Sequence, residues 1–292
     1  MSQRWITPAE LLALGAIWGA AFLFMRIAAP EIGAMPLALI RLGLGGLVLA
    51  PFVWRERQKV LEREHWGRLL AISVLNSALP FALFAWAARY SPAGVIAIAN
   101  STTSLFAALI AFVFFREPVG AVRAIALLAG FAGVVVLAGG RAAGMNVTEG
   151  AIAGTLAASS YAISATLIRK HFASLPPVPV AGATLLVGAI VMLPVGLALW
   201  PDHPVSTPAW LSALALGVLC TGVAYGIFFR LIQRVGASRA VTVTYLVPVF
   251  AVFWGWWILG EPITTRMAIA AALILGAVAL SHRRTGGANT LS

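Results

Sequence analysis

Three polar side chains stand out because they interrupt long apolar runs. Arg41 is a basic residue well inside such a run, and Asn76 and Asn100 are amides in similar surroundings. Polar groups within lipid are costly, so they usually face protein or a water-filled cavity. A guanidinium there could extend to the interface, hold free backbone carbonyl groups or receive a carboxylate, and an amide could bond to amino and carboxylate groups. The chemistry that these residues indicate is binding.

Hydroxyl and aromatic side chains in other apolar runs extend this set. A cavity with aromatic walls and a few polar groups suits a small amphipathic solute. Each hydroxyl could instead bond to a carbonyl group of its own helix or ease a helix contact, and each ring could simply pack. The predicted binding residues are Trp18, Arg41, Asn76, Phe81, Asn100, Thr103, Tyr161, Ser164, Tyr225 and Tyr245.

The sequence contains no motif of catalytic or metal-ligating residues. A membrane enzyme needs a convergent set, such as paired carboxylates or a cluster of metal ligands, and the sequence offers none. Cys220 is the single cysteine, which excludes an intramolecular disulfide and a cysteine metal site. The sequence therefore predicts a protein that is not an enzyme and that uses neither a cofactor nor a metal ion.

The composition requires lipid around the elements that carry these residues. Hydrophobic residues make up 61% of the chain and the mean hydropathy is +0.96, whereas a soluble domain is about 45–50% apolar. Apolar runs of about 20 residues can cross the hydrocarbon core, and lipid favours helices because they satisfy their own backbone. We predict an all-α integral membrane fold with ten transmembrane helices, near residues 9–28, 34–53, 67–88, 93–115, 119–139, 150–168, 179–200, 209–229, 238–259 and 264–281.

The basic residues are distributed unequally between the two sides that this topology defines. Fifteen lysines and arginines fall on the side of the chain termini and four on the opposite side. Such a bias is typical of cytoplasmic loops, so both termini are expected in the cytoplasm. The net charge of +11 therefore reflects topology, with some attraction of the loop at residues 55–68 to anionic lipid, and does not indicate a nucleic-acid partner.

The chain repeats itself. The segment FREP around Glu117 returns as LGEP around Glu261, 144 positions later. Further pairs at offsets of 143 or 144 are Trp18 with Tyr161, Arg26 with Arg169, and Phe81 with Tyr225. The sequence thus predicts two five-helix copies, residues 1–143 and 144–292. Because five is odd, the copies are inverted, an arrangement typical of transporters with a site between the halves.

The repeated Glu-Pro pair permits two interpretations. Proline suits the first turn of a helix, where its missing N–H costs nothing, and a carboxylate just before it lies at the positive end of the helix dipole. Glu117 and Glu261 are therefore expected to start helices. The alternative is an ion pair that gates the movement of the two halves.

Several motifs together resemble a known group of carriers. They are AIWGAAFLFMRI in the first predicted helix, ALIRLGLGGLVLAP in the second, and the Glu-Pro pairs after the fourth and ninth. In this order and spacing the chain is similar to the drug/metabolite transporter superfamily, and within it to the EamA-type exporters. The resemblance implies a carrier of the bacterial inner membrane, often an exporter of amino acids, with the aromatic amino acid exporters as the nearest group. Tyr161 and Thr184, which replace Trp18 and Arg41 in the second copy, indicate an asymmetric site.

The expected function is therefore export of small amphipathic metabolites, with amino acids favoured, by alternating access. No Asp, Glu or His lies deep in a predicted span, and a proton-coupled carrier usually has such a group, so we expect facilitated diffusion. The alternatives are a multidrug or neutral-metabolite exporter, a proton-coupled antiporter, and a passive channel or scaffold. The expected partners are a small-molecule substrate and membrane lipid, and the protein is expected to act as a monomer.

Overall fold

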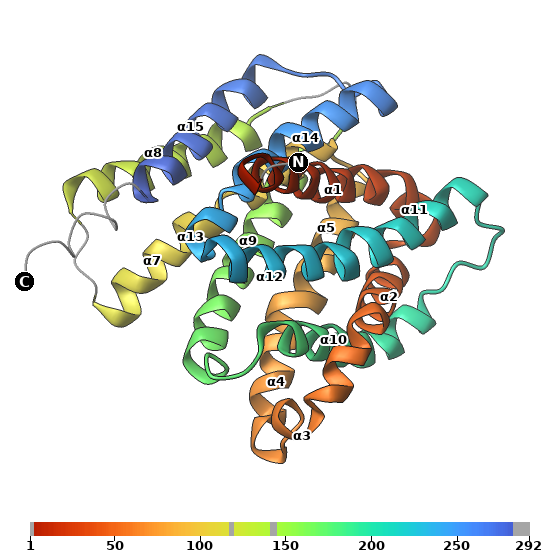
Figure 1. The fold of residues 1–292 in the computed structure, drawn as a ribbon. Helices are drawn as coiled ribbons and strands as arrows, with labels where there is room; N and C mark the ends of the chain where they lie inside the picture. Colours follow the sequence, from red (N-terminus) through yellow and green to blue (C-terminus); the bar gives the residue numbers. More distant parts are fainter. Residues whose placement is uncertain (1–2, 117–119, 141–144, 283–292) are drawn as a thin grey trace, which may run out of the picture.

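The computed structural model describes residues 3–116, 120–140 and 145–282, and within these ranges it is built from helices (Figure 1). Seven helices are continuous spans: α1 (Gln3–Ile32), α2 (Ala34–Arg55), α8 (Ala121–Ala138), α9 (Val147–His171), α10 (Pro177–Ala198), α14 (Val243–Leu259) and α15 (Thr265–His282). Among the described residues eight helical segments are long and apolar enough to cross a membrane, and α14 and α15 are shorter apolar helices. The predicted all-α fold of ten spans is confirmed.

Three spans are assembled from consecutive pieces. They are α4 (Trp66–Ser73), η2 (Val74–Ala78) and α5 (Leu79–Ala88); α6 (Ala93–Asn100) and α7 (Thr103–Phe115); and α11 (Thr207–Gly217), η3 (Val218–Val223) and α12 (Ala224–Val235). The segments η2 and η3 are π-helical and begin 144 positions apart, so both copies widen the same helix at the same place. The short elements α3 (Arg57–Val60), η1 (Arg63–His65) and α13 (Ala237–Ala240) belong to connections.

Counterpart helices of the two inverted copies pack against each other. The second helix of each copy forms one such pair, because α2 packs along α10, and the last helices form another, because α8 packs along α15. Figure 1 shows α8 and α15 side by side. Large apolar side chains such as Leu47, Phe114 and Leu128 remain exposed on the outside of the bundle, where lipid tails replace water. The boundary predicted between residues 143 and 144 falls outside the described residues and stays a prediction.

The connections alternate between two ends of the bundle because consecutive spans are antiparallel. We call the end that carries the chain termini the terminal end. The far end carries the connections α1–α2, α5–α6, α8–α9, α10–α11 and α14–α15. At the far end a single residue, Gly33, joins α1 to α2 with a φ of +88°, a conformation that glycine adopts without steric cost.

The charge bias generates a test of orientation. Alkaline phosphatase is active only outside the cytoplasm, so a fusion after Ser292 should be inactive, whereas a fusion in the α5–α6 connection at Tyr90 should be active. Phosphatase activity in whole cells, normalised to the amount of fusion protein in the membrane, is the measurement. An active fusion at Ser292 would contradict the predicted cytoplasmic termini.

Candidate functional site

Arg41 lies in the interior of the bundle, with 8% of its surface exposed. Its Nε donates to Thr221 Oγ1 of η3 at 3.0 Å, and its Nη1 approaches Met25 Sδ of α1 at 3.7 Å. Its Cζ sits 3.6 Å above the ring of Phe81 in α5. The guanidinium therefore neither reaches the interface nor holds backbone carbonyl groups, two of the roles considered from the sequence. It joins helices of both copies.

Aromatic rings surround this cation. Trp18 of α1 contacts Tyr225 of α12 edge to face, with ring centroids 6.4 Å apart, and it tilts against Phe228 at 5.1 Å. Tyr161 of α9 and Tyr225 both lie close enough to Arg41 to interact with its charge. Aromatic pairs in such geometry add to the energy of burial. The centre is thus cationic, with apolar walls.

Five of the predicted binding residues therefore meet in one place. We call this group the aromatic centre, and it consists of Trp18, Arg41, Phe81, Tyr161 and Tyr225. In the sequence repeat, Trp18 and Tyr161 occupy equivalent positions of the two copies, and so do Phe81 and Tyr225. The fold brings these pairs together because α1, α5, α9 and α12 come from inverted copies.

Asn76 and Ser164 adjoin this centre and bind each other. Ser164 Oγ lies 2.8 Å from Asn76 Oδ1 and 2.9 Å from the carbonyl oxygen of Tyr161. Ser164 is fully buried, so its hydroxyl ties η2 to α9. The side chain of Asn76 is half-buried and stays a candidate for contact with a solute.

The remaining predicted residues are Asn100, Thr103 and Tyr245, and the contacts described for them are with other parts of the bundle. Asn100 and Thr103 lie at the break between α6 and α7, where Thr103 Oγ1 donates to the carbonyl oxygen of Asn100 at 2.7 Å. Tyr245 of α14 packs against a separate apolar cluster that includes Ile98 and Ile274. Their place on the path of a solute stays a prediction.

The π-helical turn η3 positions Arg41. Thr221 Oγ1 donates at 2.9 Å to the carbonyl oxygen of Leu216, five residues back, and accepts from Arg41 Nε at 3.0 Å. A π-turn inserts an extra residue into a helix and is frequent at functional sites. Because η2 and η3 occupy equivalent positions, both copies present a widened turn to the middle of the bundle.

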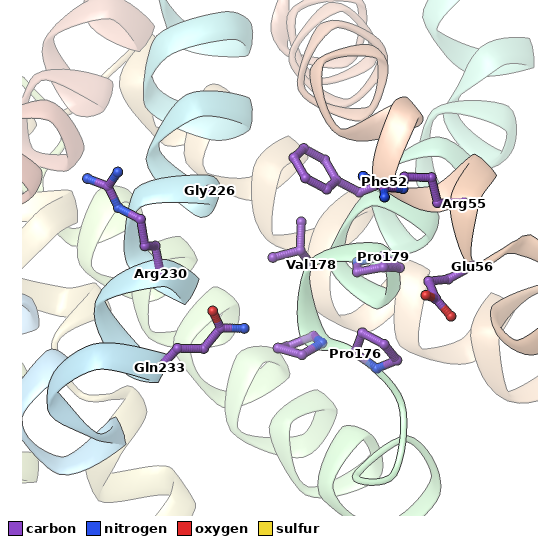
Figure 2. A pocket seen from close by; sticks show the side chains of 10 residues that line it. Phe52, Arg55, Glu56, Pro176, Val178, Pro179, Gly226, Arg230 and Gln233 are labelled. Carbon is purple, nitrogen blue, oxygen red and sulfur yellow. The ribbon is translucent and has the colours of Figure 1, made fainter.

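A crevice of about 440 Å³ opens at the terminal end, between α12 and the α2–α10 pair (Figure 2). Gln233 of α12 lies across it from Phe52 and Arg55 of α2, with Val178 of α10 between them. Arg230 of α12 also lines the crevice, but its guanidinium pairs with Glu10 of α1. Sequence reasoning missed this crevice because it counted the arginines only as charges that set orientation. The prolines at residues 176, 177 and 179, which also line it, were the available signal.

An ion pair joins the two copies at the far end. Arg26 Nε of α1 lies 2.9 Å from Glu261 Oε1, in the connection between α14 and α15. The two side chains are 17% and 5% exposed. Gly255 makes room for the carboxylate, since a Cβ atom there would collide with Glu261 Oε2. This pair is therefore a built feature of the interior.

The same two side chains also hold the α5–α6 hairpin. Arg26 Nη1 donates at 2.6 Å to the carbonyl oxygen of Ala88, the last residue of α5, and the N–H of Ala93, the first residue of α6, donates at 2.9 Å to Glu261 Oε2. Each charge meets the helix end whose dipole it complements. We call the ion pair with these two backbone groups the far-end clasp.

The prediction that Glu261 starts a helix is wrong. Gly260 ends α14 with a left-handed φ of +65°, and α15 begins only at Thr265. The intervening residues are not helical, so the carboxylate turns inward and caps α6 instead of α15. The ion pair of the alternative interpretation is present, whereas its role as a gate stays a prediction. Glu117 lies outside the described residues.

Comparison with known proteins decides the family. The EamA-like transporter family matches residues 8–139 and 148–283, one match in each copy. The chain belongs to the EamA-like transporter family. The EamA-like chain is 23% identical over 271 residues to the uncharacterized transporter YoaV of Bacillus subtilis, covering 90% of this chain and 92% of that protein. It is 26% identical over 266 residues to protein PecM of Dickeya dadantii, with coverages of 90% and 87%.

A solved crystal structure of a protein has the same fold as this EamA-like transporter. The two align with a TM-score of 0.63 and 22% identity, over 94% of this chain and 96% of the other. Together with the family match, the fold identifies a multi-pass membrane transporter of the drug/metabolite type. Membership of the aromatic amino acid exporter group is not part of that finding.

The far-end clasp generates a test of stability. Replacing Glu261 with glutamine leaves Arg26 charged and unpaired, and breaking one partner of a buried ion pair costs about 3–5 kcal/mol. The midpoint of thermal unfolding in detergent should fall by roughly 6–10 °C for a chain of this size. The control is Glu62→Gln, which neutralises an exposed carboxylate. An E261Q midpoint within error of the control would show that the clasp does not hold the far end.

Proposed function

We propose that this EamA-like transporter exports small amphipathic metabolites, with amino acids favoured, across the bacterial inner membrane by alternating access. The observation that carries the proposal is the aromatic centre, a cation with ring walls assembled from both inverted copies. A site of this kind can hold an apolar side chain by stacking and a polar head by hydrogen bonds. Its position between inverted copies is where transporters place their substrates.

The two ends of the bundle support an order of events. The clasp closes the far end while the crevice opens the terminal end, which our topology places in the cytoplasm. Gly226, which lines the crevice, directly follows Tyr225 of the aromatic centre. We propose that a solute from the cytoplasm enters at this crevice and reaches the centre from that side. Release to the outside then requires that the hydrogen bonds from Arg26 to Ala88 and from Ala93 to Glu261, which hold the α5–α6 hairpin, are broken.

Proton coupling is not required by this scheme. Glu261 is buried, and its carboxylate is already engaged by Arg26 and by the N–H of Ala93 in the far-end clasp. Glu261 itself lies in a connection, and the sequence places no Asp, Glu or His deep in a predicted span. We therefore infer transport down the solute gradient, with a proton-coupled antiporter as the alternative. The buried guanidinium disfavours cationic drugs as substrates.

The aromatic centre generates a transport prediction. Trp18→Ala removes a stacking surface, so efflux of L-phenylalanine from preloaded cells should fall at least tenfold, whereas the amount of folded protein in the membrane should not change. Asn100→Ala should lower the rate in the same direction if this amide contacts the solute. The control is Trp54→Ala, which removes an exposed ring at the end of α2. Equal losses in the Trp18 and Trp54 variants would contradict the proposed site.

The energy source has a separate test. Uptake of labelled L-phenylalanine into proteoliposomes should follow the solute gradient alone, at the same rate with and without an imposed pH gradient. Protonophore addition serves as the control for leaks. Uptake that disappears when the pH gradient is removed, while the solute gradient is kept, would establish proton coupling.

A further inference from the structure

Arg41 is a buried cation without a carboxylate partner among the described residues. Its bonds go to the hydroxyl of Thr221 and the sulfur of Met25, and one face of the guanidinium covers the Phe81 ring. Nη2 makes no hydrogen bond within the described part of the chain. A buried guanidinium can donate five hydrogen bonds and needs a negative charge to offset its loss of water. Its contacts within the protein meet only part of that need.

The groups nearest to Arg41 offer hydrogen-bond donors. The hydroxyls of Tyr161 and Tyr225 have no hydrogen-bond partner in the described ranges, and neither has the indole N–H of Trp18. None of these atoms, nor Arg41 Nη2, is among the sealed and unpaired polar atoms of the interior, so each keeps some accessible surface. A cluster of free donors around a cation favours a ligand group that only accepts hydrogen bonds and is negatively charged.

The inverted copy provides an internal comparison. The residue equivalent to Arg41 at an offset of 143 is Thr184, which is buried and bonds at 2.8 Å to the carbonyl oxygen of Ala181 in its own helix. A small neutral side chain therefore satisfies the fold at this register. Because packing does not demand a charge here, the arginine of the first copy needs another explanation.

We propose that Arg41, with the hydroxyls of Tyr161 and Tyr225, binds a carboxylate group of the transported solute. The substrates are then small carboxylates with an apolar or aromatic side chain, which the rings of Trp18 and Phe81 accommodate. This inference rests on the proposed function, because it names the chemical group that the same site recognises. The site then recognises the carboxylate of the solute and does not require an amino group.

The test measures thermal unfolding of the full chain in detergent with four matched probes. L-Phenylalanine and 3-phenylpropionate carry the carboxylate, whereas L-phenylalaninamide and phenethylamine lack it. A ligand that binds only the folded state raises the unfolding midpoint, so the two carboxylates should raise it and the other two should not. Arg41→Met should weaken carboxylate binding about 10- to 100-fold, the loss expected for hydrogen bonds to a charged group. Arg41→Lys should keep a weaker preference for carboxylates, because it retains the charge but not the fork.

The basal midpoint of the variants separates binding from a structural role. Without ligand, Arg41→Met should unfold at or above the wild-type midpoint, because it removes an uncompensated buried charge. Four results would overturn the inference. Two concern the variants: both Arg41 variants unfold at low temperature without ligand, or Arg41→Met keeps the carboxylate preference of the wild type. Two concern the wild type: carboxylates do not raise its unfolding midpoint, or chloride raises it equally, which would indicate an inorganic-anion site.

The inference and the proposed function fail separately. Confirmed efflux of amino acids, with unchanged carboxylate preference in Arg41→Met, would overturn the role of Arg41 alone. Arg41-dependent binding of 3-phenylpropionate by a chain that transports no amino acid would overturn the proposed amino acid export alone.

Discussion

A charge inside a lipid-embedded bundle must find its partner within the protein, and the Arg26–Glu261 pair meets this constraint at the far end. The two side chains come from different copies, and together they cap both ends of the α5–α6 connection. One contact therefore fixes helices of both copies relative to each other. In the same state the terminal end is open at the crevice. The clasped far end and the crevice at the terminal end are thus present in one structure.

Arg41, in contrast, is a buried charge without a carboxylate partner among the described residues, and this distinguishes the aromatic centre from the far-end clasp. Arg26 has a carboxylate, whereas Arg41 has a hydroxyl, a sulfur and a ring. A buried charge that is only partly compensated lowers stability, and proteins keep such groups mainly where function needs them. In our account the solute completes the site. Binding would then supply the interaction energy needed to favour a second state, in which the far-end clasp is open.

The sequence was sufficient for the features that depend on local pattern. Run lengths predicted the ten spans, and the offset of 143 or 144 predicted that Trp18 and Tyr161 are counterparts. The residues of the aromatic centre were predicted from the sequence, whereas the particular contacts that side chains make between the copies were not. Glu261 was judged by its place at the end of a span, but its burial depends on Arg26, 235 positions away. The π-helical turns carry no sequence signal of their own. The hydrogen bond from Arg41 to Thr221 of η3 therefore could not be predicted either.

The far-end clasp should open when a solute occupies the aromatic centre. Spin labels at Tyr90, in the α5–α6 connection, and Ile263, in the α14–α15 connection, stand on the two parts that the clasp joins, in a chain whose native Cys220 is replaced by alanine. Pulsed electron paramagnetic resonance in lipid nanodiscs should give one short distance without solute and a second, longer population with L-phenylalanine. In the Glu261→Gln variant the longer population should dominate without solute. A single distance that neither solute nor this variant changes, in protein that still transports, would contradict the account.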